Sequence, residues 1–83
     1  MNITLKLYAM LSDYLPPGAR NNQIQVELGE GAKVGALIER YNLPPKLTHL
    51  VLINGFYVAP EARSSTALRE GDTVAMWPPI AGG

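Results

Sequence analysis

The sequence predicts an α+β fold in which one main helix packs on one face of a small mixed β-sheet. Apolar and polar residues alternate with period two in several short segments, whereas one segment has the three-to-four-residue spacing of an amphipathic helix. Two strands, a crossing helix and later strands form the order typical of an α+β layer. A chain of 83 residues covers only one sheet face well. We therefore expect the other face to be partly solvated or to meet a partner.

Two strands joined by a short helical turn are expected in the first part of the chain. Apolar and polar residues alternate over 3–7 and again over 24–28, which is the pattern of a half-buried strand. Between them, the apolar pairs of residues 10–15 recur four positions apart, as in a helical turn, and Pro16-Pro17-Gly18 ends that turn. The polar residues 19–22 are expected to form a loop.

The main helix is expected over residues 34–41. Its apolar residues have the i, i+3, i+4, i+7 spacing of a core-facing stripe: Val34, Leu37, Ile38 and Tyr41. Asn42 can take the left-handed conformation that ends a helix, and the prolines that follow cannot continue it. The start is weakly signalled, because no Ser, Thr or Asp precedes it and Gly35 costs about 1 kcal/mol. Packing of the stripe must supply most of the stability of this helix.

A hairpin and a final strand follow the helix. Asn54-Gly55 separates the apolar segments 50–53 and 56–58, and this dipeptide favours a type I′ turn because both residues need a positive φ. Residues 59–66 are expected to form a polar loop. The last strand is expected over 73–77, with Val74 and Met76 on one face and Ala75 and Trp77 on the other.

Composition and charge exclude several classes of function. The chain is 47% apolar and 17% charged, and its seven basic and seven acidic residues cancel. Without a net positive field or a run of basic residues, neither nucleic acid nor a membrane surface is an expected partner. The longest apolar run is far shorter than the ~20 residues of a membrane span, and no secretion signal is recognisable. A cytoplasmic location is therefore expected.

The sequence contains no cysteine and one histidine, His49. Disulfides, thiolate metal sites, iron–sulfur clusters and a nucleophilic cysteine are therefore excluded. One histidine cannot build a metal site without several carboxylates beside it. Other polar residues fit turns and loops better than a catalytic site: Ser64, Ser65, Glu70 and Asp72. The sequence predicts no metal site and no conventional active site.

The end of the sequence is its most distinctive feature. After the last strand come Pro78-Pro79, which favour an extended polyproline conformation, then Ile80-Ala81 and Gly82-Gly83. Fully extended, this segment reaches about 20 Å, and its glycines can enter a channel that any Cβ would obstruct. We therefore divide the chain into a folded domain over 1–77 and an extended tail over 78–83. The one reactive group that the tip offers is the α-carboxylate of Gly83.

A docking surface is expected beside this tail. Trp77 and Ala75 share the strand face opposite the core-facing residues, and a small domain leaves one face of its sheet poorly covered. We expect Trp77, with Pro79 and Ile80, to belong to a hydrophobic patch that docks a partner. The alternative is that Trp77 is a core residue.

The segment Leu68–Gly83, with its terminal Pro-Pro-Xaa-Xaa-Gly-Gly, resembles the C-terminal signature of the MoaD/ThiS family of ubiquitin-like sulfur carriers. The match is best with the molybdopterin synthase branch of that family. Residues 31–38 and the Leu-Xaa-Ile-Asn-Gly hairpin at 52–55 are also similar to family members, as is the opening strand. The resemblance extends over essentially the whole chain.

The resemblance implies a β-grasp fold and a defined chemistry. An E1-like adenylyltransferase would adenylate Gly83 with Mg-ATP, and a sulfur donor would convert the acyl-adenylate into a thiocarboxylate. In the molybdopterin branch, Gly83 would give its sulfur to a cyclic pterin phosphate inside the large catalytic subunit, within a heterotetramer. The residues implied to bind that partner are Trp77, Pro78, Pro79, Ile80, Ala81 and Gly82. The chain would be a carrier rather than an enzyme, with no cofactor bound and the catalytic groups on its partners.

Two other interpretations stay open at this point. The chain could carry sulfur for another pathway, such as thiamine, thiolated tRNA or cysteine synthesis. It could also be a ubiquitin-like modifier that is joined to protein lysines. The proline pair before the glycines favours the molybdopterin branch by resemblance.

Overall fold

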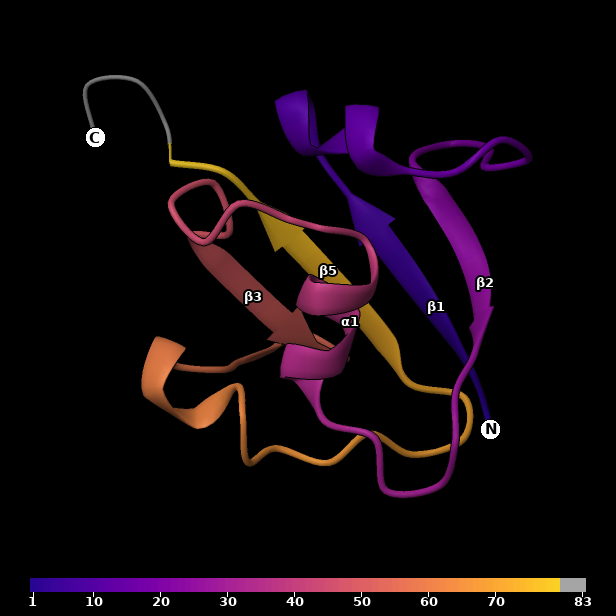
Figure 1. Ribbon diagram of the computed structural model, residues 1–83, viewed down its shortest axis with the longest axis vertical. Helices are drawn as coiled ribbons and strands as arrows, with labels where there is room; N and C mark the ends of the chain where they lie inside the picture. Colours follow the sequence, from indigo (N-terminus) through magenta and orange to yellow (C-terminus); the bar gives the residue numbers. More distant parts are fainter. Residues whose placement is uncertain (80–83) are drawn as a thin grey trace.

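The computed structural model of the chain describes residues 1–79, and its elements follow the predicted order (Figure 1). Within these residues, five strands form one mixed sheet: β1 (Asn2–Leu7), β2 (Gln23–Glu27), β3 (Leu50–Ile53), β4 (Phe56–Tyr57) and β5 (Thr73–Trp77). The main helix is α1 (Val34–Arg40), and two short 3-10 helices are η1 (Ala9–Tyr14) and η2 (Pro60–Ala62).

The strand order is β2-β1-β5-β3-β4, so the last strand of the sequence lies at the centre of the sheet. β5 runs parallel to β1, with Leu5 opposite Val74, and antiparallel to β3, with Val51 opposite Met76. The remaining two pairs are antiparallel. Because β5 has a neighbour on each side, its C-terminal end, where the tail begins, is supported from both.

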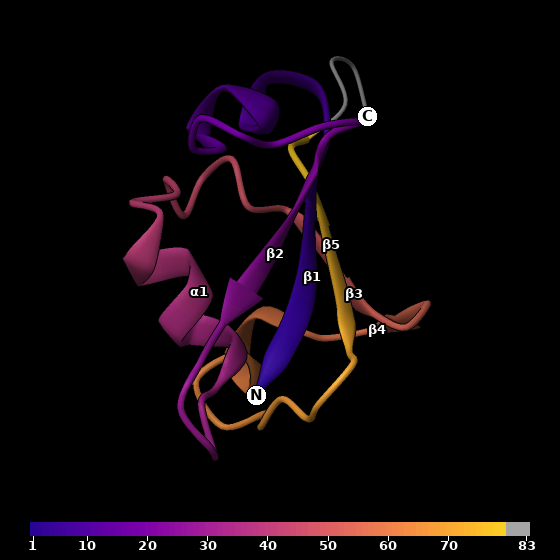
Figure 2. The same cartoon turned by 90° about the vertical axis from the view of Figure 1, so that its right-hand side faces the viewer.

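Helix α1 lies across one face of the sheet, and the other face carries no helix of the described residues (Figure 2). Buried apolar side chains from the strands, from α1 and from the connections fill the space between the two layers. They are Ile3, Leu5, Leu7, Leu11, Val26, Val34, Leu37, Leu43, Val51, Val58, Leu68, Val74 and Met76. Ile38 and Tyr41 pack against this core and are partly buried. The predicted α+β class and the predicted helix stripe are confirmed.

Helix α1 begins without a side-chain cap, as its sequence predicts. Lys33 occupies the N-cap position and makes no capping hydrogen bond. Instead, the N–H groups of Val34 and Gly35 donate to the carbonyl oxygens of Thr66 (3.0 Å) and Arg63 (2.9 Å). The segment after β4 therefore supplies the acceptors that a capping side chain provides in other helices.

Left-handed residues end α1 and turn the hairpin, as predicted. Asn42 has a φ of 54°, the conformation in which helices commonly terminate. Asn54 and Gly55 have φ values of 50° and 88°, which a type I′ turn requires.

Two boundaries after the hairpin differ from the prediction. The strand expected over 56–58 ends at Tyr57, although the N–H of Val58 still donates to the carbonyl of Val51 at 2.9 Å. The segment 59–66, expected to be a polar loop, contains η2. The reason is Pro60, whose fixed φ suits the first position of a helical turn.

Candidate functional site

The tail leaves the domain at the C-terminal end of β5. Pro78 is buried and Pro79 is exposed, so exposure begins one residue beyond the domain boundary drawn from the sequence. Pro78, implied by resemblance to bind a partner, is covered by its own domain and anchors the start of the tail. The remaining predicted tail residues lie outside the described part of the chain, and their roles stay predictions: Ile80, Ala81, Gly82 and Gly83.

Trp77 combines features of both alternatives drawn from the sequence. Its ring is half-buried and stacks on Tyr8, with ring centroids 4.5 Å apart and planes 3° from parallel. An aromatic pair of this kind contributes about 0.5–1.5 kcal/mol beyond the burial of its area. Trp77 therefore stabilises the domain with one face and still presents part of its side chain to solvent.

The backbone at the end of β5 is held from both neighbouring strands. The N–H of Tyr8 donates to the carbonyl of Met76 at 3.1 Å, and the N–H of His49 donates to the carbonyl of Trp77 at 3.0 Å. Pro78 has no N–H and cannot donate to a further rung of the ladder. We call Trp77 and Pro78 the tail base, since the domain fixes these two residues and the tail continues from them.

The sheet face turned away from α1 is polar on one half and apolar on the other. Val74 and Met76 are buried under α1, so the residues that alternate with them point to the opposite face. Strand register adds the apolar residues of β3 and β4 that lie on this same face. We call this set the apolar patch: Leu50, Leu52, Tyr57, Ala75 and Trp77. By the same alternation, the half over β1 and β2 is polar and carries Thr4, Lys6, Gln23 and Gln25.

The predicted docking surface includes one residue outside the described part of the chain, and the structure adds apolar residues of β3 and β4 to it. Trp77 belongs to the apolar patch, Pro79 is exposed just beyond it, and Ile80 lies outside the described residues. Leu50 and Leu52 were not predicted to lie on this surface, because β3 is an uninterrupted apolar run in the sequence. Both residues are half-buried. They join this surface because β3 lies beside the central strand β5.

The carboxylates considered for catalysis stabilise turns, as the sequence suggested. Oε1 of Glu70 accepts the N–H of Asn2 at 2.9 Å. Both oxygens of Asp72 accept hydrogen bonds, from Nδ2 of Asn54 at 2.9 Å and from the N–H of Arg69 at 2.8 Å. These hydrogen bonds tie the turn before β5 to the start of β1 and to the hairpin.

The polar residues His49, Ser64 and Ser65 are exposed, and no hydrogen bond joins their side chains to one another within the described part of the chain. The hydroxyl of Ser65 donates to the carbonyl of Ala62 at 3.2 Å. Within residues 1–79, no group of three acidic or histidine side chains is placed to hold a metal ion. The same residues include no helix with the length and apolar character needed to span a bilayer.

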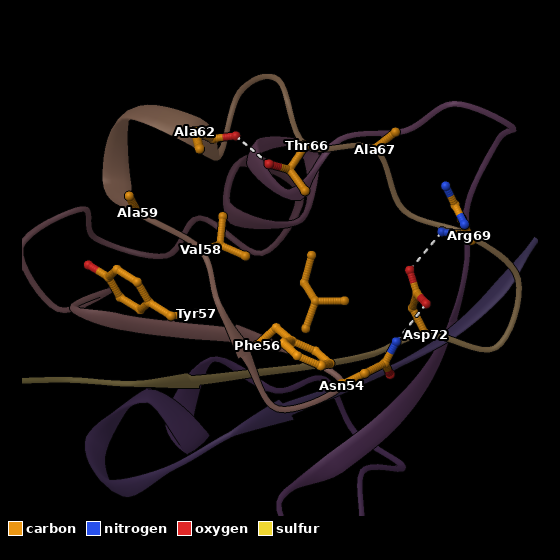
Figure 3. A pocket seen from close by; sticks show the side chains of 11 residues that line it. Asn54, Phe56, Tyr57, Val58, Ala59, Ala62, Thr66, Ala67, Arg69 and Asp72 are labelled. Atoms are coloured by element: carbon orange, nitrogen blue, oxygen red, sulfur yellow. Dashed lines mark hydrogen bonds between the residues drawn. The ribbon is translucent and has the colours of Figure 1, made fainter.

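A hollow of about 440 Å³ lies between the β3–β4 hairpin and the segment that follows it (Figure 3). Phe56 and Val58 line one side, and Ala62, Thr66 and Ala67 line the other. Two of its polar side chains are engaged, because the hydroxyl of Thr66 donates to the carbonyl of Ala62 at 2.7 Å and Asp72 accepts the two hydrogen bonds given above. Tyr57 and Arg69 also line the hollow, which is therefore a cleft of mixed polar and apolar character.

Arg63 is a buried charge that the sequence did not predict. Its side chain is 9% exposed; Nη1 donates to the carbonyl of Thr48 at 2.6 Å and Nη2 to the carbonyl of His49 at 2.9 Å. Burial lowers the pKa of the guanidinium, an effect that Tyr57 and Glu61 partly offset. The group remains protonated at neutral pH. No local pattern signals this role, since an arginine in a polar segment is usually solvated.

Comparison with known families matches the ThiS family to residues 17–83 of this chain. No curated protein sequence matches it.

Solved structures match over the full length. The crystal structure of SAMP1 from Haloferax volcanii is 27% identical with a TM-score of 0.69, and each chain covers 100% of the other. The thiamine biosynthesis protein ThiS from Geobacter metallireducens is 22% identical with a TM-score of 0.67, again with 100% of both chains covered. The complex of subunits 1 and 2 of the molybdopterin-converting factor from Helicobacter pylori contains a chain that is 14% identical, with a TM-score of 0.56 and 100% coverage of both. These likenesses confirm the ubiquitin-like β-grasp fold.

Proposed function

The chain belongs to the ThiS family of ubiquitin-like sulfur carriers, and we propose that it carries sulfur on the carboxylate of Gly83. An E1-like partner transfers AMP from Mg-ATP to this carboxylate and releases pyrophosphate. A sulfur donor then displaces AMP and leaves a thiocarboxylate. The observation that carries the proposal is the ending Pro78-Pro79-Ile80-Ala81-Gly82-Gly83, which the family match includes. The lack of cysteine supports it, because no internal thiol can intercept the acyl-adenylate.

The pathway that we propose is assembly of the molybdenum cofactor, with this chain as the small subunit of molybdopterin synthase. The tail enters the large subunit, which supplies the catalytic groups, and Gly83 gives its sulfur to a cyclic pterin phosphate. The proline pair supports this branch by resemblance. A fold shared with a chain in the two-subunit molybdopterin-converting factor of Helicobacter pylori is compatible with such a partner. The apolar patch beside the tail base is a suitable contact surface for it.

A second candidate function is favoured by a different observation. SAMP1, a small archaeal modifier protein, is 27% identical to this chain, and ThiS of the thiamine pathway matches it equally well in length. A modifier would form adducts with protein lysines that are visible on denaturing gels. A sulfur carrier would instead leave small-molecule products and an unmodified proteome.

The experiment that tests sulfur carriage is intact-mass measurement of the purified chain. Incubation with an activating enzyme, ATP and a sulfur donor is expected to replace one oxygen by sulfur in the C-terminal peptide. A variant that lacks Gly83 serves as the matched control and is expected to stay unchanged. A mass change that maps to any other peptide, or no change with a competent activating enzyme, would sink the proposal.

Gly82→Ala tests the role of the tail independently of the stability of the domain. A narrow channel must admit the tail without Cβ atoms, so displacing Gly83 by about 1 Å is expected to lower the rate of adenylation about 100-fold. Chain ends contribute little to stability, so thermal stability is expected to stay within about 0.5 kcal/mol of the parent. Pyrophosphate release measures the rate. Normal adenylation and normal sulfur transfer by this variant would show that the paired glycines are incidental.

A further inference from the structure

Arg63 is a buried cation that forms no ion pair with a carboxylate within the described residues, although Glu61 acts on its charge from a longer distance. Its hydrogen bonds go to two backbone carbonyls, and its Nε is buried with no partner among residues 1–79. Burying a charge is costly unless its hydrogen bonds are well made. A surface arginine in the same segment would avoid this cost, so the buried position requires a reason.

The two carbonyls that Arg63 binds belong to the residues just before β3. Thr48 is 2% exposed, and its hydroxyl donates to the carbonyl of Pro44 at 2.9 Å. His49 accepts the Arg63 bond with its carbonyl, and its own N–H donates to the carbonyl of Trp77 at 3.0 Å. Hydrogen bonds therefore connect Arg63 to Trp77 of the tail base through one residue, His49, although Arg63 lies 14 positions before Trp77 in the sequence. Figure 1 shows the segment before β3 beside the point where the chain leaves β5.

The planar guanidinium suits this task better than other side chains. It presents several N–H donors in a rigid fork and so holds two carbonyls in a fixed relation, whereas lysine offers a mobile point charge. An apolar side chain of similar length would fill the space but would leave both carbonyls without donors. The fork fixes the peptide between Thr48 and His49, and that peptide directs the next hydrogen bond toward Trp77.

We propose that Arg63 is a positioning residue for the reactive tail. By holding the carbonyls of Thr48 and His49, it fixes the His49 N–H that binds the Trp77 carbonyl, and so sets the direction in which the tail leaves β5. Tyr8 holds β5 from the opposite side through the carbonyl of Met76. The inference rests on the proposed function, because it assigns Arg63 a part in presenting Gly83 to the activating enzyme.

The test compares Arg63→Met and Arg63→Lys with two controls. Leu68→Ala removes a buried side chain (3% exposed) of the core. The backbone N–H of Leu68 donates to the carbonyl of Ala32, just before α1, so this variant lowers stability without touching the tail base. Arg69→Met removes an exposed arginine charge. All variants are measured at a temperature at which each remains folded by circular dichroism. Arg63→Lys retains the charge and serves as the measured variant if Arg63→Met does not fold.

Two readouts separate positioning from stability. Trp77 is the single tryptophan of the chain, so acrylamide quenching of its fluorescence reports on the tail base alone. Both Arg63 variants are expected to raise this quenching and to lower the rate of sulfur loading at saturating activating enzyme about tenfold. Leu68→Ala and Arg69→Met are expected to change neither quantity.

Equal quenching and equal loading in the Arg63 variants and Leu68→Ala would overturn the inference, since Arg63 would then contribute stability only. Failure of the parent chain to become loaded at all would instead contradict the proposed function. In that case the quenching comparison still decides whether Arg63 holds the tail base in place.

Discussion

The two halves of the uncovered sheet face differ in chemistry, although the strands beneath them are built alike. Over β1 and β2 the outward residues are polar and bond to one another, as when Nε2 of Gln25 donates to Oγ1 of Thr4 at 2.8 Å. Over β5 and β3 the outward residues form the apolar patch. The strands β1, β2, β3 and β5 bury apolar side chains of their other face under α1. Burial of the core therefore explains that face of these four strands, and we attribute the difference on the uncovered face to a partner.

The tail leaves the sheet on the apolar half of this face. Trp77 is both the last residue of β5 and a member of the apolar patch, so the patch begins where the tail begins. A partner that receives the tail would cover the apolar half and leave the polar half in water. Interfaces of this kind bury an apolar centre that contains aromatic residues and keep a polar rim.

The largest effect on affinity for a partner is expected for Trp77→Ala. The truncation should weaken association with the proposed large subunit by about 2 kcal/mol, roughly 30-fold, because aromatic residues at the centre of an interface dominate its affinity. Isothermal titration calorimetry measures the affinity, and Gln25→Ala on the polar half is the matched control that should bind like the parent. A sharply lower melting temperature with unchanged affinity per folded molecule would assign Trp77 to the fold alone.

Much of this fold could be predicted because it depends on local patterns. Alternation located β5 at its observed bounds, 73–77, and Asn54-Gly55 identified the turn of the hairpin. The strand order could not be predicted from periodicity, since a strand next to β1 or at an edge has the same alternation. The apolar patch depends on that order, because it arises only when β3 lies beside β5.

The position of a residue was predictable where strand alternation carried the signal and not where distant contacts carried it. Alternation placed Trp77 on the uncovered face of the sheet, and its role in binding a partner, which the family resemblance also implies, stays a prediction. The burial of Arg63 was not predicted, because it depends on two carbonyls that lie 14 and 15 positions away in the sequence. No residue next to Arg63 in the sequence indicates these contacts. The burial of Pro78 was missed for a related reason, since proline pairs usually mark exposed segments.

A smaller effect is expected for Leu52→Lys. Leu52 is half-buried in the apolar patch opposite Ala75, and a lysine there must lose its hydration when a partner covers it. Affinity for the large subunit is expected to fall about tenfold, or about 1.4 kcal/mol. Gln23→Lys introduces the same charge on the polar half and should leave affinity unchanged. If both variants weaken binding equally, the partner covers the whole face and the comparison between its halves fails.

Tyr8→Leu is expected to act mainly on stability. The substitution keeps an apolar side chain against Trp77 but removes the stacked ring, which contributes about 1 kcal/mol. For a domain of this size, the melting temperature should fall by about 4–8 °C. Affinity for the large subunit should change less than for Trp77→Ala, because the Trp77 side chain remains. A loss of affinity as large as that of Trp77→Ala would place Tyr8 in the interface itself.

The smallest effect is expected for the most exposed of the large apolar side chains among residues 1–79, Phe56, which is 77% exposed. Phe56 lies opposite Ile53, and Ile53 lies opposite the buried Val74, so Phe56 belongs to the face turned toward α1 rather than to the apolar patch. Exposure alone would make it the best docking residue, whereas register places it on the wrong side. Phe56→Thr retains a residue suited to strands. The free energy of unfolding should stay within about 0.5 kcal/mol of the parent, and the affinity for the proposed large subunit should stay unchanged. Thermal unfolding and calorimetry measure the two quantities. Weakened binding in this variant would mean that the partner reaches around the β4 edge into the hollow beside the hairpin, and the apolar patch would then be only part of a larger interface.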